Sequence, residues 1–276
     1  MGGWTAVAFA PAAPGAGGLG SRLSKYLHPL AGRPLAWHTL HALASLRPAP
    51  GRVLVVGAPE LEPERFPGLD VEVECVAAEG DDARAALGPR LAGGGPVLAV
   101  DAAAPALGPA LQRLVEAPPP LFLEDPRGRP LAAWVAAAPA DAARGLEAFR
   151  AAVPPGARQV DPDGFVVESR AELARATARV RDRLVRALMD AGATFLLPDT
   201  VLVDVDVRIG RDTVVYPNVV LEGQTTIGDE TVIGPGCRIV DSWVGSGVEL
   251  KGFNYVSHTS IRNRAILEPH VRRGFD

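Results

Sequence analysis

The sequence predicts two structural units, a mostly parallel α/β sheet domain followed by a short parallel β-helix. Three observations lead to this prediction. Strand-like and helix-like segments alternate through the first part of the chain, whereas aliphatic residues recur at every sixth position in the last part. Composition marks the same boundary, because every isoleucine and every asparagine lies after residue 200. At 276 residues the chain is long enough for two domains that each bury a core.

The first part of the chain alternates between short apolar stretches and stretches rich in Ala and Leu. The apolar stretches predict strands at 6–9, 52–57, 71–76, 96–101, 120–124 and 131–137. Helical patterns lie at 34–46, 83–91, 106–115 and 140–151. Near-continuous apolar strands that alternate with helices predict a mostly parallel sheet with helices on both faces. Ligands of such sheets bind at the carboxyl ends of the strands.

Two features follow predicted strand ends. The loop at 10–20 is rich in Gly, Ala and Pro. Glycine lets a phosphate approach the backbone amides, but Pro11 and Pro14 each remove a donor, so the loop is either a phosphate site or a plain connection. Asp101 closes the strand at 96–101, where a carboxylate can hold Mg²⁺ beside a substrate phosphate or cap the following turn.

A long amphipathic helix is predicted from 167 to 189, because its apolar residues recur at helical spacing. We expect this helix to connect the two units. Its arginine-rich face is expected to be solvated.

The last part of the chain has a hexad pattern, which fits neither an α-helix nor a single strand. Short strands that form a triangular coil have this period, with one aliphatic side chain per strand pointing inward. Glycine after the inward residue, as in Ile209-Gly210, relieves crowding. The pattern slips by one residue after Ile239 and resumes at Val244, so the run covers roughly four coils. The inward residues expected before the slip are Leu197, Val203, Ile209, Val215, Leu221, Ile227, Ile233 and Ile239.

Several classes of protein are disfavoured by composition. The formal charge of −4 gives no electrostatic case for nucleic acid binding. No apolar run reaches membrane-spanning length, and the first residues lack the pattern of a signal peptide. Cys75 and Cys237 show no metal or redox spacing. We therefore expect a soluble cytoplasmic protein with neither a nucleic acid nor a membrane partner.

Three segments resemble one family of bacterial enzymes. Residues 25–38, KYLHPLAGRPLAWH, are similar to the KVLHPLAGRPMLxH segment of the bifunctional N-acetylglucosamine-1-phosphate uridylyltransferase/glucosamine-1-phosphate acetyltransferase (GlmU) family. Residues 168–176, ESRAELARA, resemble the family's NNRxxLAxA, which begins an interdomain helix. Residues 187–228, from ALMDAG to TTIG, resemble the opening of the family's left-handed β-helix.

The resemblance implies a shortened nucleotidyltransferase-like domain at 1–168, an interdomain helix at 169–193 and a left-handed hexapeptide β-helix at 194–276. The family's nucleotidyltransferase domain joins UTP and N-acetylglucosamine 1-phosphate with the help of Mg²⁺, a reaction that needs positioned and neutralised phosphates. By resemblance, Lys25 contacts phosphate, while Asp101 and Glu168 hold Mg²⁺. Gly18, Gly20 and Arg22 resemble the family's substrate-binding GxGTR loop.

The match to the family pattern is incomplete. The spacing from Arg22 to Lys25 is too short, and residues 76–88 lack the uracil-recognition stretch. Glu168 and Ser169 stand where the family has a metal-binding Asn-Asn pair, although a glutamate remains a hard oxygen ligand for Mg²⁺. The segment between Asp101 and Glu168 is also shorter than in the family. Acetyltransferase activity is not expected, because the family's catalytic histidine lies beyond the matched region.

Three functions remain open. The first is a UDP-N-acetylglucosamine pyrophosphorylase-related protein with degenerate motifs that binds a nucleotide or sugar phosphate, with Mg²⁺ if the site works. The second is a non-catalytic trimeric scaffold or nucleotide-sugar sensor. The third is a hexapeptide acyltransferase with a rebuilt site, in which His258 or His270 acts as the base. A homotrimer through the β-helix is expected, because its outer faces are predicted to carry Val214, Val219, Val220 and Trp243.

Overall fold

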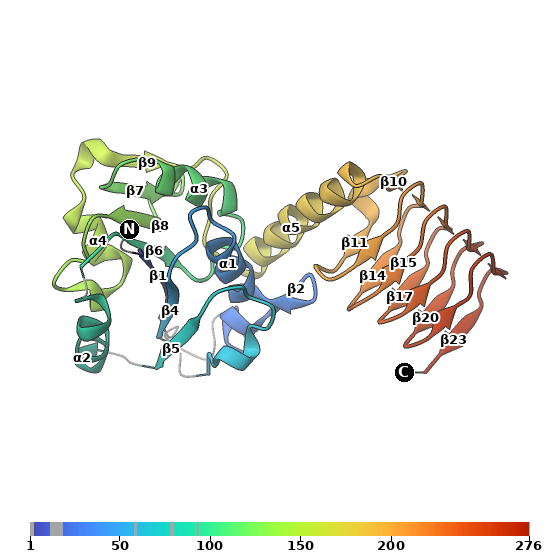
Figure 1. Cartoon of the computed structure of the whole chain (residues 1–276), viewed down its shortest axis with the longest axis horizontal. Coiled ribbons are helices and arrows are strands. Elements are labelled where there is room, and N and C mark those ends of the chain that lie inside the picture. The colour runs from blue at the N-terminus through green and yellow to red at the C-terminus, as the bar shows by residue number, and fades with distance from the viewer. Residues whose placement is uncertain (1–2, 12–18, 58–59, 78–79, 93, 276) are drawn as a thin grey trace. The chain divides into compact units, whose positions relative to one another are not determined.

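The first unit is built on a seven-stranded sheet (Figure 1). The computed structural model describes residues 3–11, 19–57, 60–77, 80–92 and 94–275. Within these residues the strand order is β5-β4-β1-β6-β8-β7-β9. In chain order these are β1 (Thr5–Ala10), β4 (Arg52–Gly57), β5 (Val73–Ala77), β6 (Val97–Asp101), β7 (Leu121–Glu124), β8 (Pro130–Val135) and β9 (Arg158–Val160). Only β8 runs antiparallel to its neighbours, β6 and β7, so the predicted mostly parallel sheet is confirmed for this part of the chain.

Helices cover the sheet of the first unit. Helices α2 (Gly80–Leu91) and α4 (Leu146–Ala152) contribute Leu87 and Phe149 to a buried cluster with alternate strand residues such as Val7. Helices α1 (Leu35–Ala44) and α3 (Gly108–Glu116) pack against each other and against strands of the same sheet. Short 3₁₀ helices are η1 (Lys25–Leu27), η2 (Pro63–Arg65), η3 (Ala142–Arg144) and η4 (Pro155–Ala157).

One helix of the first unit is shorter than predicted. The pattern at 140–151 predicts a continuous helix, but the structure has η3 followed by α4. Gly145 lies between them with a φ of +79°, in the left-handed region that a continuous right-handed helix cannot contain.

The second unit is a left-handed parallel β-helix. It contains Leu30–Arg33 and the chain from Thr177 onward, so helix α5 (Arg170–Asp190) begins in the first unit and continues in the second. Its short strands form three parallel sheets, ordered β10-β13-β16-β19-β22, β11-β14-β17-β20-β23 and β12-β15-β18-β21. The strands are β10 (Thr194–Phe195), β11 (Leu202–Val203), β12 (Arg208–Ile209), β13 (Val214–Val215), β14 (Val220–Glu222), β15 (Thr226–Ile227), β16 (Val232–Ile233), β17 (Arg238–Val240), β18 (Trp243–Val244), β19 (Glu249–Leu250), β20 (Tyr255–Ser257), β21 (Ser260–Ile261), β22 (Ile266–Leu267) and β23 (Arg272–Gly274).

The hexad residues form the inner columns of this β-helix, with one exception at its start. From Val203 onward they pair in register, as in Leu221 with Ile239 and Ile239 with Val256. The prediction for Leu197 is wrong, because this side chain is 54% exposed and precedes the 3₁₀ helix η5 (Pro198–Thr200). Phe195 fills the inward position instead and pairs with Val215.

The slip in the hexad pattern has a structural cause. After Val240 and again after Ser257 the turn is shorter by one residue than the turn after Glu222. Asp241 and His258 stand in these two turns with φ values of +42° and +45°. The two turns are stacked, since the His258 N–H donates to the Val240 carbonyl oxygen at 3.0 Å.

Glycines occupy one corner of the β-helix because the next coil leaves no room for a side chain. A Cβ on Gly210 would lie 2.3 Å from Asp229 Oδ1, and one on Gly245 would lie 2.2 Å from Asn263 Oδ1. These oxygens accept hydrogen bonds from the backbone of the coil before them: Arg211 N–H donates to Asp229 at 2.8 Å and Ser246 N–H to Asn263 at 3.0 Å. The crowding predicted after inward isoleucines is therefore observed.

The hairpin of β2 (Pro29–Leu30) and β3 (Arg33–Pro34) packs on the first coil of the β-helix. The Val205 N–H donates to the Ala31 carbonyl oxygen at 3.1 Å. Arg33 Nη2 lies 2.5 Å from Asp206 Oδ2. Four residues of the segment 25–38, Leu30–Arg33, therefore have a packing role in the β-helix unit.

No helix in the described part of the chain is long and apolar enough to cross a membrane.

Candidate functional site

The candidate site lies at the carboxyl ends of β1 and β6, as expected for a parallel sheet. These strands are neighbours, with Phe9 in register with Asp101. Further along the chain, η1 carries Lys25 and Tyr26. The Tyr26 hydroxyl is buried and donates to the Pro11 carbonyl oxygen at 3.0 Å, which fixes η1 next to the end of β1.

Asp101 is the charged group that interacts with the other charged residues of this site. Its Oδ1 accepts the Ala103 N–H at 2.7 Å. Burial raises the pKa of Asp101, while the nearby Lys25 ammonium and the Ala103 N–H oppose that shift. Glu168 raises the pKa further, so Lys25 and Glu168 both act on the same carboxyl.

Tyr26 responds to the same carboxylates. Burial raises its pKa, and the negative charges of Asp101, Glu168 and Glu60 raise it further. The Lys25 Nζ lies 5.1 Å from the centre of the Tyr26 ring, a cation–π distance. The phenol therefore stays protonated at neutral pH and acts as a hydrogen-bond donor.

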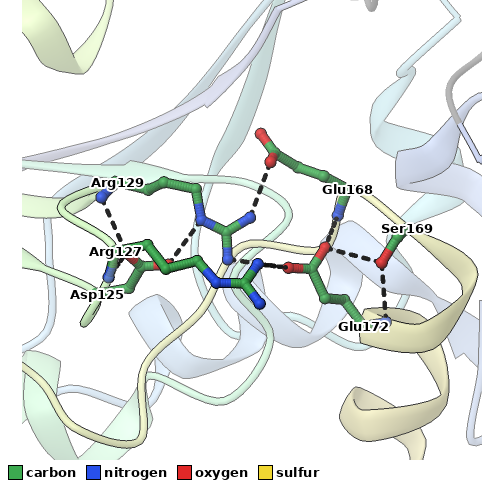
Figure 2. A network of polar contacts seen from close by, with 6 residues as sticks. All are labelled: Asp125, Arg127, Arg129, Glu168, Ser169 and Glu172. Carbon is green, nitrogen blue, oxygen red and sulfur yellow. Dashed lines mark hydrogen bonds and ion pairs between the residues drawn. The ribbon is translucent and has the colours of Figure 1, made fainter.

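A second set of charges surrounds Glu168 and is centred on Arg129 (Figure 2). Its guanidinium Nη1 lies 2.8 Å from Glu168 Oε2, its Nη2 lies 3.0 Å from Glu172, and its Nε lies 2.6 Å from Asp125. We call these four residues the Arg129 network. They come from the β7–β8 turn and the start of α5.

Within the Arg129 network, Asp125 and Glu172 are fixed as carboxylates. Asp125 is 1% exposed, and its Oδ1 accepts the N–H groups of Arg127 at 2.8 Å and Arg129 at 2.9 Å. Burial alone would raise the pKa of Asp125, but the backbone and guanidinium of Arg129 hold it below its usual value. The same balance lowers the pKa of Glu172, where the Glu168 N–H is the largest favourable contact.

Ser169 and Glu172 start α5 with an arrangement close to a capping box. The Ser169 Oγ accepts the Glu172 N–H at 3.1 Å, and Glu172 Oε2 accepts the Ser169 hydroxyl at 3.1 Å and the Glu168 N–H at 2.9 Å. The Ser-x-x-Glu pattern at 169–172 is readable in the sequence, and it was the available signal for this network. Sequence reasoning missed Arg129 itself, because its partners are four to forty-three residues away.

The loop residues predicted to bind substrate are only partly described. Gly18 lies outside the described residues. Gly20 has a φ of +61°, and Arg22 is exposed. The Leu19 carbonyl oxygen accepts a hydrogen bond from Arg170 Nε at 3.0 Å, which ties the end of this loop to the start of α5.

The donor set does not fit a Mg²⁺ ion as it stands. One oxygen of Asp101 is taken by the Ala103 N–H, and Glu168 Oε2 is taken by Arg129. Among the described residues, no group of three or more His, Cys, Asp or Glu side chains is arranged to hold a metal ion. Mg²⁺ requires near-octahedral oxygen ligands, and the guanidinium beside Glu168 occupies one carboxylate oxygen and repels a cation at the same group.

His258 and His270, the two candidate acyl-transfer bases, each contact a neighbouring side chain of the β-helix. His258 is mostly exposed, and its Nδ1 lies 3.9 Å from Asp241 Oδ2 at the edge of a hollow of about 400 Å³ that Trp243 also lines. The His270 ring stacks on Phe253 at 5.3 Å.

Comparison with known proteins adds to this picture. Residues 206–240 match the model of the bacterial transferase hexapeptide (six repeats). The bifunctional protein GlmU of Caldanaerobacter subterraneus is 39% identical over 108 residues, which cover 38% of this chain and 23% of the relative. The matched region of this chain is similar to the GlmU proteins. The GlmU of Lactobacillus helveticus is 46% identical over 84 residues, or 30% of this chain and 18% of the relative.

The GlmU relationship is carried by the hexapeptide region. The chain spans about a quarter of the length of the GlmU proteins that it matches. Among solved structures, one from Bacillus anthracis, named as a glucose-1-phosphate thymidylyltransferase in complex with sucrose, is 13% identical with a TM-score of 0.47. The likeness covers 65% of this chain and 96% of that one.

Proposed function

We propose that this chain is a UDP-N-acetylglucosamine pyrophosphorylase-related protein that binds a nucleotide or sugar phosphate at the strand-end site, with degenerate catalytic motifs and no acetyltransferase site. The observation that supports this proposal is that the hydrogen bond from Tyr26 to Pro11 holds η1, which carries Lys25, next to the end of β1, while Asp101 ends the neighbouring strand β6. An ammonium group at this edge neutralises phosphate charge, which is the main requirement of phosphoryl chemistry.

A second candidate is a non-catalytic trimeric scaffold or nucleotide-sugar sensor with the same architecture. The pairing of Glu168 with Arg129 favours it, because the carboxylate that would complete a metal site is already neutralised. The enzyme and the sensor share the ligand and differ in turnover, whereas a scaffold needs no ligand. Both place the protein in the cytoplasm, where nucleotide sugars are made.

Both proposed functions include a homotrimer formed through the β-helix. Of the residues expected on the outer faces, Val219 is instead buried in the core, whereas Trp243 is exposed. Leu202 and Ile266 are large exposed apolar residues on the other two sheets. Association of three copies along the β-helix would cover such residues. Sedimentation equilibrium should give three times the monomer mass, and a monomer at micromolar concentration would reject the trimer.

Ligand binding can be tested with the chain's two lysines. Lys25 lies at the candidate site, whereas Lys251 lies on the β-helix in an ion pair with Glu268 and serves as an internal control. Acetylation followed by mass spectrometry should show protection of Lys25 by UTP, dTTP, UDP-N-acetylglucosamine or a sugar 1-phosphate. Labelling of Lys251 should be unchanged.

The outcomes separate the candidates. Absence of Lys25 protection at millimolar concentrations of every ligand would reject a phosphate-binding site. Protection together with pyrophosphate release from UTP and N-acetylglucosamine 1-phosphate would support the enzyme. Protection without release, with or without Mg²⁺, would support the sensor.

A further inference from the structure

The carboxylates next to the candidate site have a permanent counter-ion in Arg129. Its guanidinium contacts Asp125, Glu168 and Glu172 through three different nitrogens at 2.6 to 3.0 Å. A guanidinium stays protonated at every pH that a folded protein tolerates, and its planar N–H groups suit several carboxylates at once. Partners at three positions fix the orientation of this cation.

Backbone hydrogen bonds place the Arg129 network beside Asp101. Asp101 Oδ1 accepts the Ala103 N–H at 2.7 Å, and the Ala103 carbonyl oxygen accepts the Val167 N–H at 2.9 Å. Glu168 follows Val167 directly, so it starts from a backbone that is tied to the end of β6. Four carboxylates, those of Asp101, Asp125, Glu168 and Glu172, therefore gather where β6, the β7–β8 turn and α5 meet.

Carboxylates gathered in this way would attract a divalent cation if their oxygens were free. In this chain Arg129 neutralises three of the four groups, and Asp125 uses both of its oxygens for Arg127 and Arg129. The guanidinium is therefore placed where a metal ion would otherwise balance the charge.

We propose that Arg129 takes the place of the divalent cation at the candidate site, so that this site excludes Mg²⁺ and binds phosphate ligands without it. The exclusion of metal is independent of the proposed function, whereas metal-independent binding of a phosphate ligand rests on it.

The exclusion can be tested with Mn²⁺ alone, whose free-ion electron paramagnetic resonance signal disappears on binding. The wild-type chain should show no Mn²⁺ site that depends on Glu168. Arg129→Gln should gain a site that binds Mn²⁺ at least about tenfold tighter and that Mg²⁺ displaces, because the freed carboxylates are hard oxygen ligands. Arg127→Gln is the matched control, since Arg127 also contacts Glu172 but its side chain is 75% exposed.

Arg129→Gln leaves the buried Asp125 without its partner and can unfold the domain. The paired variant Asp125→Asn/Arg129→Gln removes the buried charge as well, and the asparagine oxygen can still accept the two backbone N–H groups. It should fold and gain the Mn²⁺ site, which Glu168→Gln in the same background should abolish. A folded paired variant without that site, or a wild-type site lost in Glu168→Gln, would overturn the proposal.

Protection of Lys25 from acetylation tests the second part of the proposal, the binding of a phosphate ligand without Mg²⁺. If a phosphate ligand protects Lys25 in the wild-type chain, the protection should be equal with EDTA and with Mg²⁺. Protection that needs Mg²⁺ would overturn the metal-independent part. No protection under either condition would reject the proposed function and leave the Mn²⁺ result to decide the role of Arg129.

Discussion

Arg33 and Asp206 form an ion pair at 2.5 Å, although 173 residues separate them in the sequence. The pair holds the β2–β3 hairpin on the first coil of the β-helix, together with the hydrogen bond from Val205 to Ala31. The segment at 25–38 therefore contributes to both units, because Lys25 lies in the first unit while Leu30–Arg33 belong to the β-helix unit.

Gly32 at the tip of this hairpin should not tolerate a side chain. It has a φ of +78°, and a Cβ would lie 2.7 Å from the Asp204 Cγ. We expect Gly32→Ala to lower the free energy of unfolding by about 2 to 4 kcal/mol, the sum of backbone strain and overpacking. Urea denaturation measures the loss. Gly20→Ala is the control, since Gly20 has a φ of +61° with nothing within 4 Å; equal losses would show that the contact with Asp204 does not matter.

Gly245 tests the crowded corner of the β-helix without a backbone effect. A Cβ there would lie 2.2 Å from Asn263 Oδ1, so Gly245→Ala must disturb the hydrogen bond from Ser246 to Asn263. A loss of about 1 to 3 kcal/mol in unfolding free energy is expected. Gly156→Ala, with nothing within 4 Å, should be neutral or stabilising by up to about 1 kcal/mol. A Gly245→Ala variant as stable as Gly156→Ala would show that the corner relaxes freely.

Asp101→Asn should stabilise the protein at neutral pH. Burial raises the pKa of Asp101, so its charged form is less favourable in the folded state than in the unfolded chain. The destabilisation is absent below the unfolded pKa of about 3.8 and grows as the pH rises above it. Thermal unfolding should therefore show a higher Tm for Asp101→Asn at pH 7 and little difference near pH 3. A lower Tm at pH 7 would contradict a desolvated carboxylate.

Asp125→Asn is the same chemical change with the opposite expected sign. The pKa of Asp125 is lowered by its contacts with Arg129, so its carboxylate stabilises the folded state above the unfolded pKa of about 3.8. This contribution is lost as the pH falls through the lower folded pKa. We expect a loss of about 3 kcal/mol at pH 7, since one partner of a buried ion pair is removed. The loss should shrink with acidification, and a loss independent of pH would point to packing instead of charge.

Cys75 should react slowly with alkylating reagents in the folded protein. Burial, followed by the charges of Glu64, Glu62 and Glu74, raises its pKa to about 11, so the thiolate is scarce at pH 8. Iodoacetamide labelling followed by mass spectrometry should show little modification of Cys75 until urea unfolds the chain. Fast labelling of Cys75 at pH 8 in the native state would show that the thiol is activated.

The β-helix was predictable from sequence because its period is local. Each strand must place one aliphatic side chain inward, and from Val203 onward the column is readable at a glance. Leu197 was wrongly predicted to point inward because the hexad spacing continues through it. Pro198 starts a 3₁₀ helix and turns the chain before the first full coil. Phe195 was missed because it lies two residues out of the period.

The candidate site was only partly predictable. Asp101 could be proposed because parallel strands end at a common edge, whereas Lys25 was proposed only from the resemblance of its segment to a known family. Arg129 could not be found, since the contacts that define it join the β7–β8 turn to α5 across distant parts of the chain. A Ser-x-x-Glu pattern identifies a helix start, but it carries no information about which arginine its glutamate meets.

The stacked short turns at Asp241 and His258 show how change spreads through this solenoid. Each coil packs directly on the next, so a corner that is one residue shorter requires a corner of the same length in the neighbouring coil. Deletion of one turn residue in a single coil would therefore misalign that coil with its neighbour. Neighbouring coils must be shortened together for the inner columns to stay aligned. Shortened turns in such a β-helix are therefore expected in matched pairs. In this chain one such pair is visible in the sequence, where two spacings of five residues between inward side chains interrupt spacings of six.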